Sequence, residues 1–379
     1  MLQAAELVAA AHRAAGLAQS GGPPFHLLEA FVASITAEAQ LTKAGWAARR
    51  RHIERLLVNN IRLTTLQERQ PEIFAAEMPP PLVIVGMPRS GTTKLHRLLS
   101  RDASFNVVST WENLFPIPLS DSPSDREMRR QIGIMFAKGL RTNSPDIYAV
   151  HPIDAEEPEE EIWLMQHSFL TESVEAELRV PTYLEYLKAQ DVRPMYDQLG
   201  LWLLALSAQG TRPALPWLLK GTFHTAHLDV LLETFPQAKL VYCYRDPLQA
   251  VPSYMSLVEK LRRQQSDHVD LQELGRTILT SFSRQQAKGK AHRRNRSSAI
   301  LEVAYRDIVA RPLDVVRQIY EFAGLQASEA TLSDMRAWND ANPQYLHGQH
   351  AYLPEKYGLS ANDIEAACHD YRSERPAEA

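Results

Sequence analysis

Residues 82–99 read LVIVGMPRSGTTKLHRLL, and this stretch decides the fold. It opens with four apolar residues, 82–85, directly after three prolines at 79–81 that stop any preceding helix. A loop with two glycines follows, and then comes the pattern of an amphipathic helix. A strand, a tight loop and a helix N-terminus in this order let backbone amides bind an anionic group. The stretch therefore predicts a phosphate-binding loop.

This loop differs from that of an ATP-dependent enzyme. Gly86 and Gly91 have the spacing of the glycines in GxxxxGK[ST], but Thr92 stands where that motif has its lysine. A loop without the lysine is poorly equipped for the β- and γ-phosphates of a triphosphate. Arg89 supplies the positive charge instead. The hydroxyl groups of the loop belong to Ser90, Thr92 and Thr93. This set suits a ligand with a single 5'-phosphate that carries a transferable group.

Strand-like runs alternate with helical patterns along the remaining chain. Besides 82–85, short apolar runs occur at 217–219, 239–244 and 299–305, and each precedes a helical pattern. Such alternation predicts an α/β fold with a P-loop-like parallel sheet flanked by helices.

Composition limits the classes of function. The 379 residues are 45% hydrophobic and 23% charged, which is typical of a globular protein, and the net charge of -4 gives no basic footprint for nucleic acid. Two cysteines are too few for a disulfide framework or a zinc site, and no metal is expected. The chain has no apolar run of about 20 residues and no signal peptide, so we expect no membrane partner and a cytoplasmic location.

Several motifs in a fixed order carry a resemblance to a known family. PRSGTT at 88–93 resembles the 5'-phosphosulfate loop of the sulfotransferases, in particular of a bacterial branch similar in fold to the tyrosylprotein sulfotransferases. The resemblance runs over residues 40–372 and rests on QPEI at 70–73, TWENLFP at 110–116, AEEPEEE at 155–161, WLLKGTFH at 217–224, YRDPLQAVPSYMSL at 244–257, AYRDI at 304–308 and HAYLPEKYGL at 350–359. It implies 3'-phosphoadenosine 5'-phosphosulfate (PAPS) as the sulfuryl donor, and no metal.

The resemblance also implies the donor site. In the family, an arginine and a serine at the positions of Arg245 and Ser253 hold the 3'-phosphate, and an arginine at a strand's carboxyl end can bind phosphate bidentately. Pro252 is expected to kink or interrupt the helix that presents Ser253. The family lysine that matches Lys220 contacts the bridging oxygen, so Lys220 and Arg89 would stabilise the leaving bisphosphate. Tyr305 is expected either to approach the nucleotide or to pack in the core.

Two residues are candidates for the general base. Glu112 is the first, because it matches the region of the catalytic glutamate of tyrosylprotein sulfotransferases and has apolar neighbours that would raise its pKa. His224 is the second, although the small-molecule cytosolic sulfotransferases have the spacing K-x-H and here Lys220 precedes His224 by four residues. The acidic run at 154–161 is expected to be solvated or structural rather than to orient a cationic acceptor.

The chain divides into two parts by pattern. Residues 1–78 predict an N-terminal helical segment, in which Arg49 to Arg51 are expected to form a solvated helix face. Residues 79–379 predict the α/β domain, and its mostly helical insert at 105–216 is the expected place of acceptor specificity.

Alternative functions remain open at this stage. A P-loop kinase or NTPase would prefer ATP with magnesium, and a noncatalytic nucleotide-binding module would bind without turnover. The sulfotransferase hypothesis predicts instead tight binding of adenosine 3',5'-bisphosphate. The sequence leaves open the acceptor, which is a hydroxyl or amine of a small molecule or peptide, and the oligomeric state.

Overall fold

The computed structural model describes residues 3–17, 24–210, 215–295, 297–343 and 352–373. Its centre is a four-stranded sheet with the order β2-β1-β3-β4, in which all neighbours are parallel. The strands are β1 (Leu82–Gly86), β2 (Leu218–Lys220), β3 (Lys239–Tyr244) and β4 (Ile300–Ala304). The predicted α/β fold is therefore confirmed, and each strand lies at a predicted run.

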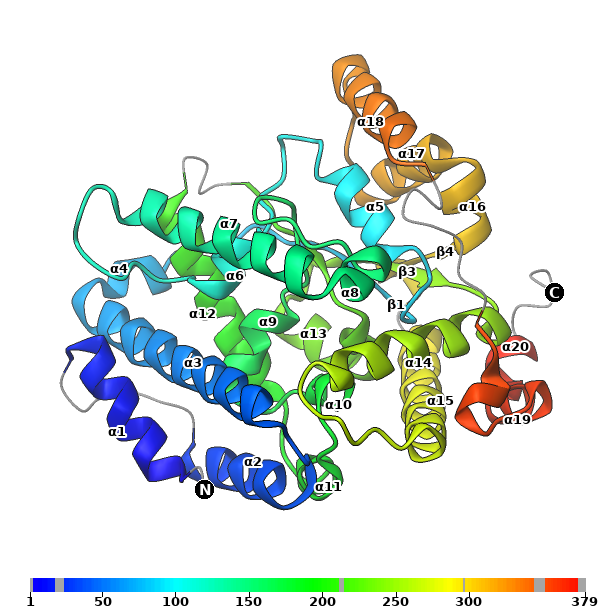
Figure 1. The fold of residues 1–379 in the computed structure, drawn as a ribbon. Coiled ribbons are helices and arrows are strands. Elements are labelled where there is room, and N and C mark those ends of the chain that lie inside the picture. Colours follow the sequence, from blue (N-terminus) through cyan, green and yellow to red (C-terminus); the bar gives the residue numbers. More distant parts are fainter. Residues whose placement is uncertain (1–2, 18–23, 211–214, 296, 344–351, 374–379) are drawn as a thin grey trace.

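Both faces of the sheet are covered, which explains why the strands are continuously apolar. Ile84 and Val241 pack on one face against α5 (Thr92–Leu99), α17 (Pro312–Ala323) and α18 (Glu329–Ala341). The alternate residues Val85 and Leu240 point to the other face, into a larger core built from the insert and the N-terminal helices. Figure 1 shows α17 and α18 on one side of the molecule and α1 and α2 on the opposite side.

The remaining helices surround this sheet. Before β1 the structure has α1 (Ala4–Ala15), α2 (Phe25–Glu38), α3 (Lys43–Arg69) and α4 (Pro71–Phe74). Between β1 and β2 it has α6 (Thr110–Leu114), α7 (Asp125–Asn143), α8 (Pro145–Val150), α9 (Ile162–Met165), η1 (Gln166–Ser168), α10 (Val174–Glu177), α11 (Pro181–Leu187) and α12 (Arg193–Gln209). Later come η2 (Thr222–Ala226), α13 (Leu228–Thr234), α14 (Pro247–Arg263), α15 (Leu271–Asn295), η3 (Ser297–Ala299), α16 (Tyr305–Ala310), η4 (Pro354–Tyr357), α19 (Ala361–Ala367) and α20 (His369–Ser373). None of the helices in these described segments is long and apolar enough to cross a membrane.

The long helix α3 corrects one prediction. Its Ile53, Leu57 and Ile61 are buried in the larger core, as their spacing suggests. Arg49, however, is buried rather than solvated, and its guanidinium forms an ion pair with Glu177 at 2.6 Å. The run of three arginines therefore divides between the core and the surface, because neighbouring helix residues point about 100° apart.

Candidate functional site

The phosphate loop has the backbone that its glycines predict. Gly86 has φ 127° and lies so close to β3 that a Cβ would be 2.0 Å from the carbonyl oxygen of Cys243. Gly91 has φ 86° at the N-cap of α5. Arg89 also has a positive φ of 67°, which is unusual for a residue with a side chain and is seen often at functional sites. The Ser90 hydroxyl donates to the Met87 carbonyl at 2.6 Å and so braces the turn.

A cavity of about 1240 Å³ opens beside this loop. The loop, the start of α5, α14, α16, α3 and the insert all contribute to its lining. Sites for one drug-sized ligand commonly measure about 300–1,000 Å³. The cavity is therefore large enough to hold two substrates at once, as a group transfer requires.

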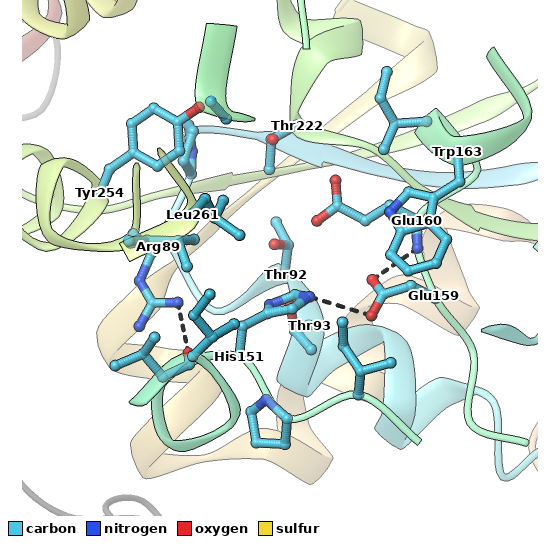
Figure 2. Close-up of a pocket in the computed structure, with 18 of the residues that line it drawn as sticks. Arg89, Thr92, Thr93, His151, Glu159, Glu160, Trp163, Thr222, Tyr254 and Leu261 are labelled. Atoms are coloured by element: carbon cyan, nitrogen blue, oxygen red, sulfur yellow. Dashed lines mark hydrogen bonds and ion pairs between the residues drawn. The ribbon is translucent and has the colours of Figure 1, made fainter. Parts of the chain in front are cut away.

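Arginines gather at the loop end of the cavity. Arg89 donates from Nε to Ser253 Oγ at 3.1 Å and from Nη1 to the Val150 carbonyl at 3.2 Å, which is drawn in Figure 2. Arg245 donates to the Arg89 carbonyl at 3.0 Å, and its guanidinium lies 4.0 Å from the centre of the Tyr305 ring. Burial lowers the pKa of Arg89, because desolvation penalises the cation. An anion placed here would be bound by fixed cations.

The presentation of Ser253 differs from the prediction. Helix α14 runs without interruption from Pro247 to Arg263 although it contains Pro252. Pro252 lies in its second turn, so only one backbone hydrogen bond near the helix start is lost. Ser253 lies on the cavity wall and in contact with Arg89.

Lys220 ends strand β2 beneath the phosphate loop. Its side chain is 0% exposed, and its Nζ lies 2.5 Å from Glu160 Oε1, 3.7 Å from Glu159 Oε1 and 3.4 Å from Thr93 Oγ1. Both Glu160 and Thr93 line the cavity. The buried ammonium is thus compensated by carboxylates, as a desolvated cation needs to be.

The acidic run divides between the surface, as expected, and the cavity. Glu159 and Glu160 line the cavity, whereas Asp154 and Glu156 are exposed as predicted. Glu159 is held by His151, whose Nε2 lies 3.2 Å from Glu159 Oε2 (Figure 2). Burial alone would raise the pKa of Glu159, but His151 and Lys220 reverse this and hold the pKa well below its usual range. Glu159 is consequently a fixed negative charge.

Glu112, the first candidate base, has a different role in the structure. Its carboxylate caps its own helix, α6, where Oε2 accepts from Ser109 N at 3.0 Å and from Ser109 Oγ at 2.7 Å. Its other oxygen lies 3.8 Å from Arg126. Glu112 is not among the residues that line the cavity, so the geometry does not support it as a base in this conformation.

His224, the second candidate, is buried behind the cavity wall. Its Nε2 lies 2.7 Å from Glu161 Oε1, and its Nδ1 lies 2.9 Å from the Tyr196 hydroxyl. Both ring nitrogens are engaged, and the side chain is 1% exposed. Burial would raise the pKa of Glu161, but the hydrogen bond and charge of His224 outweigh it and lower the pKa. The pair braces the segment after Lys220, and His224 does not reach the cavity.

The structure thus brings most of the predicted site residues together. Those that line the cavity are Arg89, Gly91, Thr92, Thr93, Arg245, Ser253 and Tyr305. Ser90 and Lys220 lie directly behind them. Tyr352, from the late family segment, also lines the cavity, while His350 lies outside the described residues. Within the described ranges, no group of three or more His, Cys, Asp and Glu side chains is arranged to hold a metal ion.

Sequence reasoning missed Glu160 as a site residue. The available signal was the segment AEEPEEE, which the resemblance had identified but which reads as an ordinary charge run. Lys94, one residue beyond the loop hydroxyls, was also missed. It lines the cavity, and burial lowers its pKa.

Comparisons with known proteins identify the family. The model of the family described as "Sulfotransferase family" matches residues 80–329. The enzyme named omega-hydroxy-beta-dihydromenaquinone-9 sulfotransferase Stf3, from Mycobacterium bovis and from Mycobacterium tuberculosis, is 28% identical over 292 residues, which are 74% of this chain and 70% of that protein.

Two solved structures are similar over nearly the whole chain. Sulfotransferase STF1 from Mycobacterium tuberculosis is 26% identical with a TM-score of 0.83, covering 97% of this chain and 98% of that one. Sulfotransferase STF9 from Mycobacterium avium has a TM-score of 0.87 and covers 99% of this chain and 97% of that one. At 24% identity, the likeness to STF9 concerns the fold alone.

Proposed function

The chain belongs to the sulfotransferase family, as its motifs predicted, and we propose that it transfers a sulfuryl group from PAPS to a hydroxyl of a largely apolar small molecule. The observation that carries the proposal is that Arg89 and Arg245 line the phosphate-loop end of one large cavity, while the buried Lys220 reaches Thr93 of the loop from behind the cavity wall. Three cations around a glycine loop without the ATP-type lysine fit a donor with two separate phosphate groups.

The residues at this end divide between the two phosphates of the donor. The backbone amides at the start of α5, with Arg89, Thr92 and Thr93, would bind the 5'-phosphosulfate. Arg245 and Ser253 would bind the 3'-phosphate, as the family resemblance implies. The contact of Arg89 with Ser253 and that of Arg245 with the Arg89 carbonyl support this, because they bring the two subsites next to each other. Tyr305 would hold the Arg245 guanidinium flat against its ring.

The donor supplies a sulfuryl group on a good leaving group, adenosine 3',5'-bisphosphate. In the transfer, the acceptor oxygen forms a bond to sulfur while the bond from sulfur to the bridging oxygen breaks. Lys220 would stabilise the charge that builds on the bridging oxygen, because its Nζ lies beside Thr93 of the loop. The acceptor proton must go to a base within hydrogen-bond reach of the acceptor hydroxyl.

We propose Glu160 as that base, in place of Glu112 or His224. Its carboxylate lines the cavity, is 17% exposed and lies next to Lys220, whereas the other two candidates are engaged elsewhere. Glu159 fits the task less well, because its depressed pKa makes it a weak proton acceptor.

The insert supports an apolar acceptor. Among the apolar residues that line the cavity are Ile132, Phe136, Leu140 and Trp163 of the insert and Leu257 and Leu261 of α14. Phe136 and Trp163 form an edge-on pair with ring centres 6.2 Å apart. The name of the relative Stf3 describes a hydroxylated menaquinone as its acceptor, which agrees with a hydroxyl on an apolar framework.

Calorimetric titration tests the donor assignment. The purified protein should bind adenosine 3',5'-bisphosphate with micromolar or tighter affinity and prefer it to ATP-magnesium. Arg245→Ala should lower the affinity for the bisphosphate by about 10- to 100-fold, since it removes a charge-assisted bidentate contact. Arg263→Ala, an exposed arginine at the far end of α14, is the matched control and should leave the affinity unchanged. Preference for ATP-magnesium, or no binding of either nucleotide, would refute PAPS as the donor.

A further inference from the structure

The cavity has a second polar region on helix α3, far from the phosphate loop in sequence. Ala48, Arg51, His52 and Arg55 line the cavity. Their spacing of three, four and seven residues from Ala48 places them on one face of the helix. We call Arg51, His52 and Arg55 the α3 cluster. It presents two guanidinium groups and an imidazole to the same cavity that holds the donor site.

The distance between the donor site and the α3 cluster can be estimated along helix α14. Ser253, Leu257 and Leu261 line the cavity at steps of four residues along one face of α14. Eight residues separate Ser253 from Leu261, which corresponds to about 12 Å of helix. Beyond that point, Gln265 accepts a hydrogen bond of 3.2 Å from Arg49 of α3. The apolar side chains of Leu257 and Leu261 therefore lie between Ser253 and the α3 cluster.

Arg55 forms no ion pair with any carboxylate that the structure describes, although Glu177 lines the same cavity. Its Nη2 donates to His52 Nδ1 at 3.0 Å, but over the described segments no carboxylate lies within ion-pairing distance of it. The neighbouring carboxylate, Glu177, is already engaged, with one oxygen 2.6 Å from Arg49 and the other 3.2 Å from Gln166. Burial lowers the pKa of Arg55 to about 10, and the charge of Glu177 opposes this only in part. Arg55 is therefore a half-buried cation that faces the cavity and, among the described residues, is not ion-paired with a carboxylate.

We propose that the α3 cluster binds an oxyanion at the far end of the acceptor, which makes the acceptor an amphiphile with a hydroxyl at one end and a carboxylate or similar group at the other. This rests on the proposed function, because Glu160 and Lys220 define the end at which the hydroxyl reacts. The apolar wall between the two ends suits an alkyl or isoprenoid chain. A guanidinium suits the far group, since it can bind a carboxylate bidentately.

Binding of a matched pair of probes tests this inference. Dodecanoate and dodecanol share one chain and differ in the head group, and each is titrated into protein saturated with adenosine 3',5'-bisphosphate. The wild type should bind dodecanoate more tightly than dodecanol. Arg55→Met should lower the affinity for dodecanoate by about 10- to 100-fold and leave the affinity for dodecanol nearly unchanged, because only the charged contact is removed. Arg50→Met is the control, since Arg50 is exposed on α3 and pairs with Glu54 away from the cavity.

Turnover gives a second readout. With PAPS, omega-hydroxydodecanoate should have a lower KM than dodecanol, and Arg55→Met should raise the KM of the acid while leaving kcat similar. Equal binding of the two probes, no binding of dodecanoate, or a preference that survives Arg55→Met would overturn the inference.

The donor site is tested separately from the α3 cluster. Dodecanoate binding is repeated without bisphosphate on Arg245→Ala, whose donor site is weakened. A preference for dodecanoate that disappears in Arg245→Ala but persists in Arg55→Met would place the anion at the donor site and refute the α3 assignment. If the wild type does not bind the bisphosphate but still prefers dodecanoate to dodecanol in an Arg55-dependent way, only the donor proposal is refuted.

Discussion

Glu160 and Lys220 form an ion pair of 2.5 Å between Oε1 and Nζ, and Glu160 lines the cavity beside the phosphate loop. Glu160 comes from the insert and Lys220 from the end of β2. The ammonium also approaches Thr93 of the loop at 3.4 Å. This arrangement puts a carboxylate that can accept a proton beside a cation that can stabilise a leaving group, which are the two charges a sulfuryl transfer needs.

Removal of the proposed base should slow turnover without loss of donor binding. Glu160→Gln keeps the shape of the side chain and should lower kcat by about 100- to 10,000-fold. Glu156→Gln is the control, because Glu156 is exposed, pairs with Arg130 at 2.7 Å and should leave kcat unchanged. The measurement is steady-state sulfuryl transfer beside bisphosphate titration. A Glu160→Gln enzyme with wild-type kcat would remove Glu160 from the mechanism.

The same assay decides the role of Glu112. Glu112→Gln should retain kcat within about twofold, because glutamine also serves in a capping box and the side chain does not line the cavity. A loss of kcat as large as that expected for Glu160→Gln, with unchanged thermal stability, would restore Glu112 as the base and imply that it moves during turnover.

Replacement of Lys220 should affect the chemical step more than donor binding. Lys220→Met should lower kcat by about 100- to 1000-fold, the effect of removing one preorganised donor to the leaving group. Melting temperature must be followed in parallel, because Glu160 then loses its partner. A large loss of bisphosphate affinity with unchanged kcat would contradict the assigned role and make Lys220 a binding residue.

The phosphate loop should not tolerate a side chain at Gly86. Gly86→Ala puts a Cβ 2.0 Å from the Cys243 carbonyl at φ 127°, and we expect it to lower the free energy of unfolding by at least about 3 kcal/mol. Gly200→Ala is the matched control. Gly200 lies inside α12 with nothing within 4 Å of an added Cβ, so the alanine should raise the free energy of unfolding by about 0.5–1 kcal/mol. Urea unfolding of both variants measures the contrast, and equal effects would show that the loop is not constrained as described.

The buried, neutral side chain of His167 should make the folded protein less stable in acid. His167 Nδ1 lies 2.8 Å from the Leu164 carbonyl and Nε2 lies 3.0 Å from Asn59 Nδ2, so one nitrogen donates and the other accepts. Burial lowers the pKa of His167 to about 3. Below pH 6.5 the unfolded chain binds a proton that the folded protein refuses, so stability is lost as the pH falls toward 3.

The size of this effect can be isolated in a variant. Between pH 7.5 and pH 5, protonation of His167 in the unfolded chain should lower the free energy of unfolding by about 2 kcal/mol. This is because pH 5 lies about 1.5 units below the pKa of an unfolded histidine. His167→Gln should be less stable than the wild type at pH 7.5, and the gap should narrow by that amount at pH 5. A gap that stays constant with pH would mean that folding does not change the pKa of His167.

The sequence by itself determined the sheet, the phosphate loop and its preference for arginine over the ATP-type lysine. These features are local: a buried parallel strand needs a continuous apolar run, and a tight loop needs glycine where φ is positive. Arg245 and Ser253 were also readable, because both follow directly from strand β3 and the helix after it.

Only the tertiary structure decided which carboxylate and which arginines face the cavity. Glu112 looked suitable by its apolar neighbours, yet it caps α6, while Glu160 looked like one charge in a solvated run. Arg49 and Arg55 lie on the same helix, but Arg49 is paired in the core, whereas Arg55 faces the cavity and forms no ion pair with the carboxylates that the structure describes. Such pairings join residues distant in sequence, and they depend on how the insert and α3 pack against the sheet, which no local pattern encodes.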